Sequence, residues 1–266
     1  MPTHLGVLKK MKTQDGSPVQ YNLDLGESSI LMNELVGKSI KLTHTGNIYC
    51  RICGRKLKKT YGEGFCYEHF MTSPEASPCI IRPELCEGHL GIGRDAEWEE
   101  KNHNKPHVVY LAISSGAKVG VTRADQVPTR WIDQGAWKAI ILAEVPYRRL
   151  AGEIEVSLKK HISDKTQWQR MLKNELATEV DLLERKKEMS ALVPEEFQQY
   201  LSENDEIWEL SYPVNQFPEK VKSVNFLKQA ETEAVLNGIK GQYLIFDNQQ
   251  VVNIRKHTGF EVELSW

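Results

Sequence analysis

The alternation of hydrophobic and polar positions is clearest in the middle of the chain, where it predicts a β-hairpin. Residues His107–Ile113 form an apolar run rich in β-branched side chains, which is typical of a buried strand. The small residues Ser114–Ala117 indicate a turn, and Lys118–Thr122 predicts a second strand. We therefore expect these two strands to pair across the turn.

Helical periodicity follows the hairpin. A helix is predicted over Thr129–Gly135, after the turn residues around Pro128, and Ala139–Val145 predicts a third strand. A long amphipathic helix is predicted from about Ala151, because its apolar residues recur every four positions and so share one face. A charged helix is predicted over Lys165–Ser190. The apolar residues that define the amphipathic helix are Ile154, Leu158 and Ile162.

Short strands are predicted near both ends of the chain. Alternating runs between Gly6 and Thr45 indicate a small antiparallel β unit. Similar runs close to the C-terminus predict a second β unit, which we expect to pair with the first. Its strands are predicted at Ile207–Tyr212, Gly241–Phe246, Val251–Ile254 and Phe260–Leu264.

Four residues with the spacing of a zinc site follow the N-terminal strands. Cys50 and Cys53 form one pair, Cys66 and His69 form another, and twelve residues separate the pairs. Thiolates and imidazoles arranged in this way suit tetrahedral zinc. Four protein ligands leave no open position for water, so we expect a structural site. In zinc-finger peptides such a site contributes about 10–16 kcal/mol of apparent binding energy to folding.

A second group of ligand-type residues comes directly afterwards, with irregular spacing. Cys79, Cys86, His89 and His103 could hold a second zinc ion, and His107 lies close behind them. Single histidines in loops are more often solvated than bound to metal, and His89 is the least secure member of the set.

A basic stretch lies on the loop of the first cysteine pair. Two aromatic residues, Tyr61 and Phe65, follow it. Basic side chains neutralise phosphates and aromatic rings stack on bases, so this stretch indicates a nucleic-acid contact; the alternative is an ordinary solvated loop. The basic residues are Arg51, Arg55, Lys56, Lys58 and Lys59.

Composition restricts the class of protein. The chain has 266 residues, 40% of them hydrophobic and 26% charged, as in an ordinary globular protein. The net charge of −2 gives no overall basic character, so nucleic-acid binding would require a local patch. No apolar run is long enough to cross a membrane, and the N-terminus lacks the pattern of a signal peptide. We expect a cytoplasmic protein, in which the five cysteines are metal ligands rather than disulfides. The sequence does not indicate an oligomeric state.

The central stretch resembles the GIY-YIG nuclease domain. Tyr110 stands where the tyrosine of the first triplet would be, Lys118–Gly120 replaces the second triplet, and Arg130 and Glu155 take the places of the arginine and the metal-binding glutamate. The chain departs from the pattern, because a valine replaces the first glycine and Lys118 the second tyrosine. The resemblance implies phosphodiester hydrolysis, with Tyr110 and Lys118 activating water, Arg130 on the phosphate, and Glu155 binding Mg²⁺ or Mn²⁺. Taken one by one, such residues are usually structural.

A resemblance over most of the chain points to one bacterial family, the domain of unknown function numbered twenty-seven ninety-seven. It implies no activity. It does imply that relatives more often have cysteine at the positions of His69 and His103, and often have another cysteine at the position of Gly93. The motifs that carry it are Cys50–Gly54, Cys79–Cys86, Val109–Ala112, Lys118–Arg123, Pro128–Ala136 and Asp164–Trp168.

We therefore predict an α+β protein with a GIY-YIG-like mixed α/β domain at its centre. The predicted segments are an N-terminal β unit (1–48), a zinc-binding module (49–106), the GIY-YIG-like domain (107–190) and a C-terminal helix and β unit (191–266). Three functions remain open. They are a metal-dependent nuclease, a nucleic-acid-binding protein without catalysis, and a zinc-stabilised scaffold for a protein partner.

Overall fold

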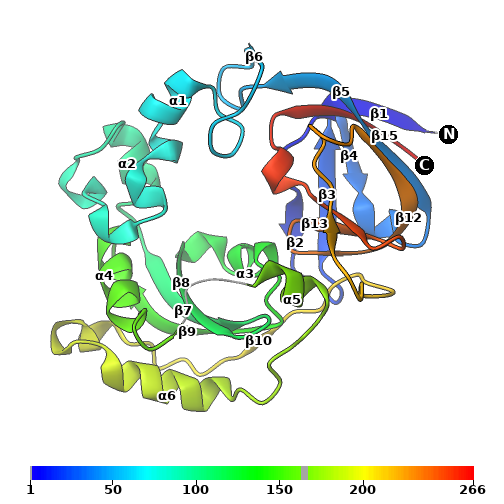
Figure 1. The fold of residues 1–266 in the computed structure, drawn as a ribbon. Helices are drawn as coiled ribbons and strands as arrows, with labels where there is room; N and C mark the ends of the chain where they lie inside the picture. Colours follow the sequence, from blue (N-terminus) through cyan, green and yellow to red (C-terminus); the bar gives the residue numbers. More distant parts are fainter. Residues whose placement is uncertain (1, 163–166) are drawn as a thin grey trace. The chain divides into compact units, whose positions relative to one another are not determined.

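The computed structural model describes residues 2–162 and 167–266, which form a mixed α+β chain with two compact units (Figure 1). One unit combines residues 1–71 with residues 210–266, and the other spans residues 72–209. The two units group the chain differently from the four predicted segments. The predicted zinc-binding module contributes residues to both of them.

The first unit contains two sheets, in which all neighbouring strands are antiparallel except β11 and β14. Its larger sheet has eight strands, in the order β1-β15-β5-β12-β13-β14-β11, with β6 paired to β5; β2, β3 and β4 form the smaller sheet. The N-terminal and C-terminal strands do pair, since β15 lies between β1 and β5. The strand predicted at Ile207–Tyr212 does not join them, because Trp208–Glu209 pairs with Lys138 and Ala139 in the second unit. The elements are β1 (Thr3–Val7), β2 (Lys12–Gln14), β3 (Gln20–Leu25), β4 (Ser28–Leu31), β5 (Ser39–Tyr49), β6 (Lys56–Leu57), α1 (Tyr67–Thr72), β11 (Lys222–Ser223), β12 (Glu231–Lys240), β13 (Tyr243–Phe246), β14 (Gln250–Asn253) and β15 (Phe260–Ser265).

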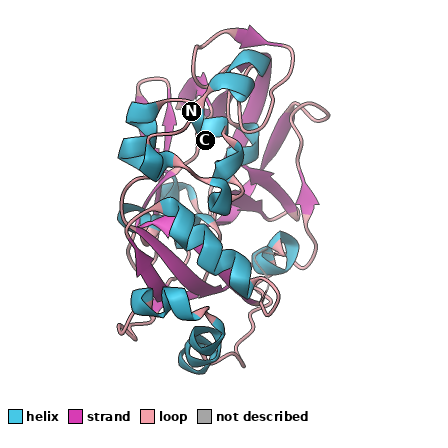
Figure 2. Cartoon of the chain, turned by 90° about the vertical axis from the view of Figure 1, so that its left-hand side faces the viewer, coloured by secondary structure: helices cyan, strands magenta, loops and turns pink. Residues whose placement is uncertain are grey.

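The second unit has a four-stranded antiparallel sheet in the order β10-β9-β7-β8, with helices packed against it (Figure 2). The helix α3 lies on one side of this sheet and α6 on the other (Figure 1). The elements are α2 (Ala96–Asn102), β7 (His107–Ile113), β8 (Ala117–Arg123), α3 (Thr129–Asp133), β9 (Lys138–Val145), α4 (Arg148–Leu158), α5 (Trp168–Leu172), α6 (Leu182–Leu192) and β10 (Trp208–Glu209); short 3₁₀ turns precede α2, among them η3 (Pro78–Ile80), η4 (Pro83–Leu85) and η5 (Gly88–Leu90).

The predicted hairpin is present, and β7 is its central strand. All seven residues of β7 are buried, which explains why the strand reads as one continuous apolar run. On one face Val109, Leu111 and Ile113 pack with Ile154 and Leu158 of α4. Tyr110 points to the opposite face, because successive side chains of a strand alternate.

The single charged helix predicted over Lys165–Ser190 is wrong where the structure describes it. Two helices, α5 and α6, stand in its place, and Lys165 and Thr166 lie outside the described residues. Asn174 has a left-handed φ of 57°, a conformation typical of a helix end, directly after α5. Asp181 then caps α6 by accepting hydrogen bonds from the backbone N–H groups of Leu183 and Glu184.

In the part of the chain that the structure describes, no helix combines the length and the apolar character needed to cross a membrane.

Candidate functional site

The first predicted ligand set comes together in the first unit. Cys50 follows β5, Cys66 precedes α1 and His69 lies on α1, and the ligand atoms of these residues and of Cys53 all lie within 4.8 Å of one another. The Nδ1 atom of His69 is 3.2 Å from the Sγ of Cys66 and 3.6 Å from that of Cys50. This group can hold a metal ion, and three thiols with one imidazole match a structural zinc site.

The backbone around this set favours the thiolate form of Cys50. Burial opposes ionisation, but hydrogen bonds from the backbone of Cys53, Cys66 and Ile52 outweigh it and lower the pKa of the Cys50 thiol to about 6. The N–H of Cys66 donates to Cys50 Sγ at 3.3 Å, and the N–H of His69 donates to Cys66 Sγ at 3.4 Å. A thiolate, rather than a thiol, is the form that binds metal.

A second ligand set lies in the second unit, and its membership differs from the prediction. Cys79, Cys86, Glu99 and His103 bring their ligand atoms within 4.8 Å of one another. The Nδ1 atom of His103 is 3.4 Å from Cys86 Sγ and 4.0 Å from Cys79 Sγ, and it also contacts the Glu99 carboxylate. Hydrogen bonding between the thiols, which the imidazole of His103 reinforces, lowers the pKa of Cys86 to about 4, while the pKa of Cys79 is raised.

Glu99, rather than His89, completes this second set. His89 stacks its ring on Tyr147, with the ring centroids 4.2 Å apart. Glu99 lies on α2, one helical turn before the C-cap residue His103, so both side chains share one face. A Cβ atom built on Gly93 would lie 2.4 Å from the side chain of Glu99. The Glu99 carboxylate therefore occupies the space beside Gly93, the position where the family resemblance implies a cysteine in relatives.

The second ligand set is hydrogen-bonded to α4, the helix that carries Glu155. The guanidinium of Arg148 donates to the carbonyl oxygen of Cys79 at 3.0 and 3.2 Å, and the N–H of Arg148 donates to the carbonyl of His103 at 3.0 Å. At Gly152 the helix backbone comes so close to η4 that an added Cβ would lie 2.2 Å from the backbone nitrogen of Glu84. Only glycine permits this approach.

The four residues that were predicted to be catalytic come from β7, β8, α3 and α4, and three of them, Tyr110, Lys118 and Arg130, are joined by hydrogen bonds, whereas Glu155 acts on Tyr110 through its charge. The hydroxyl of Tyr110 donates to Gln134 Oε1 at 3.0 Å, and Lys118 Nζ donates to the same oxygen. Arg130 is hydrogen-bonded to Tyr110, and the charge of Glu155 acts on the Tyr110 phenol as well. Gly120 leaves room for this arrangement, since a Cβ there would lie 2.6 Å from the Tyr110 hydroxyl.

Most of this cluster is buried. Tyr110 and Lys118 are 1% and 2% exposed, Glu155 is 8% exposed, and Arg130 is half-buried. Burial raises the pKa of Tyr110, and the nearby Arg130 charge offsets part of that rise. Lys159 Nζ lies 3.3 Å from Glu155 Oε2, so the Glu155 carboxylate already has one cation beside it.

The predicted basic residues are exposed on the loop of the first ligand set. Arg55 forms an ion pair with Glu68 at 2.7 Å, and the Arg51 guanidinium lies over the ring of Phe65, 5.0 Å from its centroid. Phe65 is buried, so its ring is not available for stacking on a base, contrary to the sequence interpretation. Lys56, Lys58 and Lys59 are exposed.

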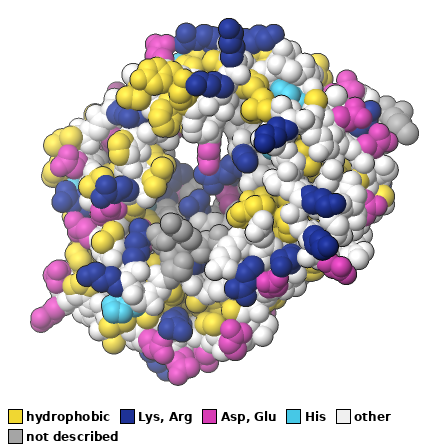
Figure 3. All heavy atoms as spheres, viewed as in Figure 1, with side chains coloured by type: hydrophobic (Ala, Val, Ile, Leu, Met, Phe, Trp, Pro, Cys, Tyr) yellow, Lys and Arg dark blue, Asp and Glu magenta, His cyan; other side chains and the backbone are white. Residues whose placement is uncertain are grey.

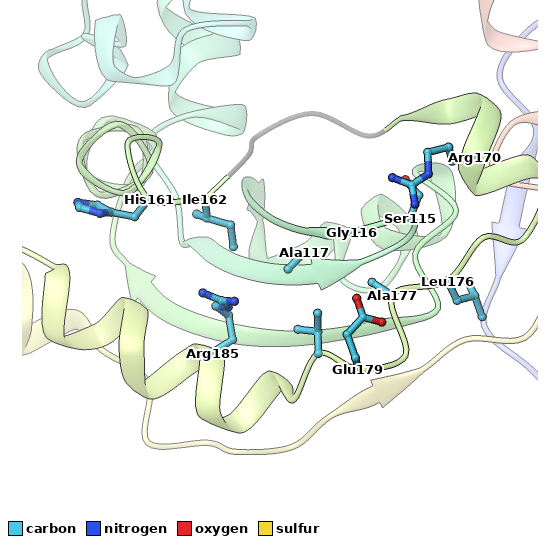
Figure 4. A pocket seen from close by; sticks show the side chains of 11 residues that line it. Ser115, Gly116, Ala117, His161, Ile162, Arg170, Leu176, Ala177, Glu179 and Arg185 are labelled. Carbon is cyan, nitrogen blue, oxygen red and sulfur yellow. The ribbon is translucent and has the colours of Figure 1, made fainter.

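A separate cavity of about 530 Å³ lies in the second unit, and none of the predicted site residues lines it. The turn between β7 and β8 forms one wall, and residues around α5 and α6 form the other (Figure 4). Its two arginines already have acidic partners, since Arg170 pairs with Glu175 and Arg185 with Glu188.

The sequence did not indicate Glu99, Gln134 or Arg148. Each is a common residue type, and its position matters only because the fold brings it to a cluster. The four-residue spacing of Glu99 and His103 was the one signal available, since it places two metal-ligand types on the same helical face.

Comparisons with known proteins identify a family. No curated protein and no solved structure matches the chain. The GIY-YIG resemblance therefore has no support from these comparisons. The family described as "Protein of unknown function (DUF2797)" matches residues 37–262, which is most of the chain. The protein belongs to the DUF2797 family.

Proposed function

We propose that this protein is a zinc-containing nucleic-acid-binding protein whose β7–α4 segment is a GIY-YIG-type phosphodiesterase centre. The observation that carries the proposal is the convergence of Tyr110, Lys118, Arg130 and Glu155. These residues come from four different elements, yet Tyr110 is hydrogen-bonded to Arg130, shares Gln134 with Lys118, and is influenced by the charge of Glu155. A phenol, two cations and a carboxylate can together orient a water molecule, bring positive charge to a phosphate and hold a divalent ion.

Three tasks are divided among these four side chains in this proposal. The Tyr110 oxygen, which shares Gln134 with Lys118 and is held by Arg130, accepts a hydrogen bond from the attacking water and orients it, and the proton that the water loses passes to solvent. Arg130, the most exposed of the four, contacts the phosphate and stabilises the charge of the transition state. Glu155 supplies an oxygen ligand to Mg²⁺ or Mn²⁺, which needs only one or two protein carboxylates when substrate phosphates complete its shell. Such an ion would stabilise the leaving oxygen.

The two cysteine-containing sets would hold zinc as structural ions. The first has the Cys₃His ligands of a closed site. The second has two thiols, one imidazole and one carboxylate, and its loops lie against α4. Zinc in the second set would therefore support the helix that carries Glu155.

Cleavage of labelled single- and double-stranded DNA and RNA, with Mg²⁺ or Mn²⁺ added, tests the proposal. Arg130→Ala should slow cleavage by about 100- to 1,000-fold, the usual effect of losing one group that stabilises transition-state charge. Tyr110→Phe should also slow it strongly. Arg149→Ala is the matched control, because Arg149 pairs with Glu153 on the surface of α4. Equal rates for Arg130→Ala and Arg149→Ala would contradict the proposal.

One observation favours a second candidate, a nucleic-acid-binding protein that does not cleave. Tyr110, Lys118 and Glu155 are almost fully buried and contact groups of the protein itself. A cluster of this kind can act purely as a polar core. In that case Tyr110→Phe would lower the free energy of unfolding, while nucleic-acid binding would remain and no cleavage would occur with any metal.

A further inference from the structure

Three aromatic side chains gather on the surface beside the first ligand set. We call Tyr61, Tyr67 and Phe70 the aromatic patch. The ring of Tyr61 lies 5.2 Å from that of Tyr67 and 6.2 Å from that of Phe70. Tyr67 is 60% exposed and Phe70 is 37% exposed, although large aromatic side chains of soluble proteins usually bury their rings. Grouped aromatic rings at a surface mark an interaction site.

Basic residues lie beside this patch, and its two acidic neighbours already have cationic partners, since Glu68 pairs with Arg55 and Glu63 with Arg255. The stretch from Arg51 to Lys59 contains five basic residues and no acidic one, although the whole chain carries a net charge of −2. Lys59 Nζ lies 5.0 Å from the centroid of the Tyr61 ring. Figure 3 shows the Lys and Arg side chains along the rim over β6, with hydrophobic side chains beside them. Basic and aromatic groups therefore share one continuous surface.

The first ligand set fixes the orientation of these rings. Tyr67 and Phe70 stand three positions apart on α1, so they lie on the same side of the helix. A helix of six residues is not stable by itself. The ligands Cys66 and His69 precede and lie within α1, so a metal ion held there would anchor the helix and present both rings together.

We propose that the aromatic patch and the adjacent Lys56, Lys58 and Lys59 form a binding site for single-stranded nucleic acid. The lysines neutralise phosphates, and exposed bases stack on the rings of Tyr67 and Phe70. A duplex would engage only the lysines, because its bases are stacked on each other inside the helix. A polyanion complements the charge of this surface, because Arg51–Lys59 contains no acidic residue. This inference rests on the proposed nucleic-acid function and specifies the form of nucleic acid.

Fluorescence anisotropy with a labelled mixed-sequence oligonucleotide, single-stranded or annealed to its complement, tests the site in the full-length protein. Tyr67→Ala and Phe70→Ala should each weaken single-strand binding by about 5- to 100-fold, the effect of losing one stacked base, and should leave duplex binding nearly unchanged. Replacing Lys58 and Lys59 together by Glu should weaken the binding of single-stranded and of duplex nucleic acid, and should reduce the dependence of the affinity on salt concentration. The matched control for the aromatic variants is Leu227→Ala, at a residue of the same unit that is 62% exposed. The matched control for the lysine variant replaces the exposed Lys220 and Lys228 together by Glu.

The outcomes separate this inference from the proposed nuclease. Selective loss of single-strand binding in Tyr67→Ala supports the site, whether or not the wild type cleaves. Cleavage by the wild type, with single-strand affinity unchanged in the Tyr67→Ala, Phe70→Ala double variant, overturns the site and leaves the nuclease standing. Absence of all nucleic-acid binding by a correctly folded wild type, or equal losses in the patch variants and the Leu227→Ala control, also overturns it.

Discussion

Gly152 provides a sharp test of how α4 is positioned. A Cβ atom at this residue would lie 2.2 Å from the backbone nitrogen of Glu84 and 2.4 Å from the carbonyl carbon of Pro83. Alanine in the interior of a helix normally stabilises it by about 1 kcal/mol relative to glycine. Overpacking costs about 1–3 kcal/mol, and more when the obstacle is backbone that cannot move aside. The obstacle at Gly152 is backbone, so the upper end of that range, about 3 kcal/mol, applies; after the gain of about 1 kcal/mol, we expect Gly152→Ala to lower the free energy of unfolding by about 2 kcal/mol.

Two other glycines of the same unit calibrate this value. A Cβ on Gly120 would meet the tip of the Tyr110 side chain at 2.6 Å, so Gly120→Ala should cost about 1–3 kcal/mol and displace the Tyr110 hydroxyl. Nothing lies within 4 Å of a Cβ on Gly116, so Gly116→Ala should change stability by no more than about 0.5 kcal/mol. The three variants make the same chemical change in three different surroundings.

Urea denaturation followed by tryptophan fluorescence measures the series. With a slope of about 2 kcal/mol per molar urea, the expected loss in Gly152→Ala shifts the midpoint down by about 1 M. A Gly152→Ala protein as stable as the wild type, with the same slope, would refute the close approach of α4 to η4. It would also remove the argument that the second ligand set supports Glu155.

Two further predictions concern metal content and acid stability. Protein purified without chelators should contain about two zinc ions per chain; Glu99→Ala should reduce this to about one and His89→Ala should leave it unchanged, as elemental analysis would show. Burial lowers the pKa of His107 to about 3, so His107 stays neutral in the folded protein while the unfolded chain takes up a proton below its ordinary pKa of about 6.5. The buried His107 should therefore leave the free energy of unfolding nearly unchanged above pH 6.5 and lower it by about 2 kcal/mol at pH 5, and this loss should level off below pH 3. His107→Gln should remove this part of the acid sensitivity in denaturation curves measured from pH 8 to 4.

The sequence predicted those parts of the fold whose local pattern agrees with the tertiary structure. Strand β7 is apolar at every position but His107 and Tyr110, so its burial could be inferred directly. Strand β12 was not predicted, because Glu231–Lys240 mixes glutamates, an asparagine and a glycine with its apolar residues. Its pairing with β5 on one side and β13 on the other determines its structure. A strand of this kind depends on partners distant in the sequence.

The same distinction between local pattern and tertiary structure applies to the candidate sites. Closely spaced cysteines are rare enough to indicate the first ligand set from sequence alone. Glu99 could not be chosen among 36 acidic residues, because only the fold, in which α2 packs against η5, brings its carboxylate to Cys79 and Cys86. His89 appeared equivalent to His103 in the sequence, yet it stacks on Tyr147 instead.

The catalytic role of the Tyr110 cluster is the central claim, and Glu155→Gln tests it most directly. This change keeps the shape of the side chain and removes the charge that would hold Mg²⁺ or Mn²⁺. Glu153→Gln is its matched control, two residues away on α4 and paired at the surface with Arg149 at 2.9 Å. Cleavage of labelled nucleic acid at saturating Mn²⁺ should be abolished in Glu155→Gln, with binding and folding retained, and should be unchanged in Glu153→Gln. Equal cleavage by the two variants, or no cleavage by the wild type with any divalent metal, would contradict the account.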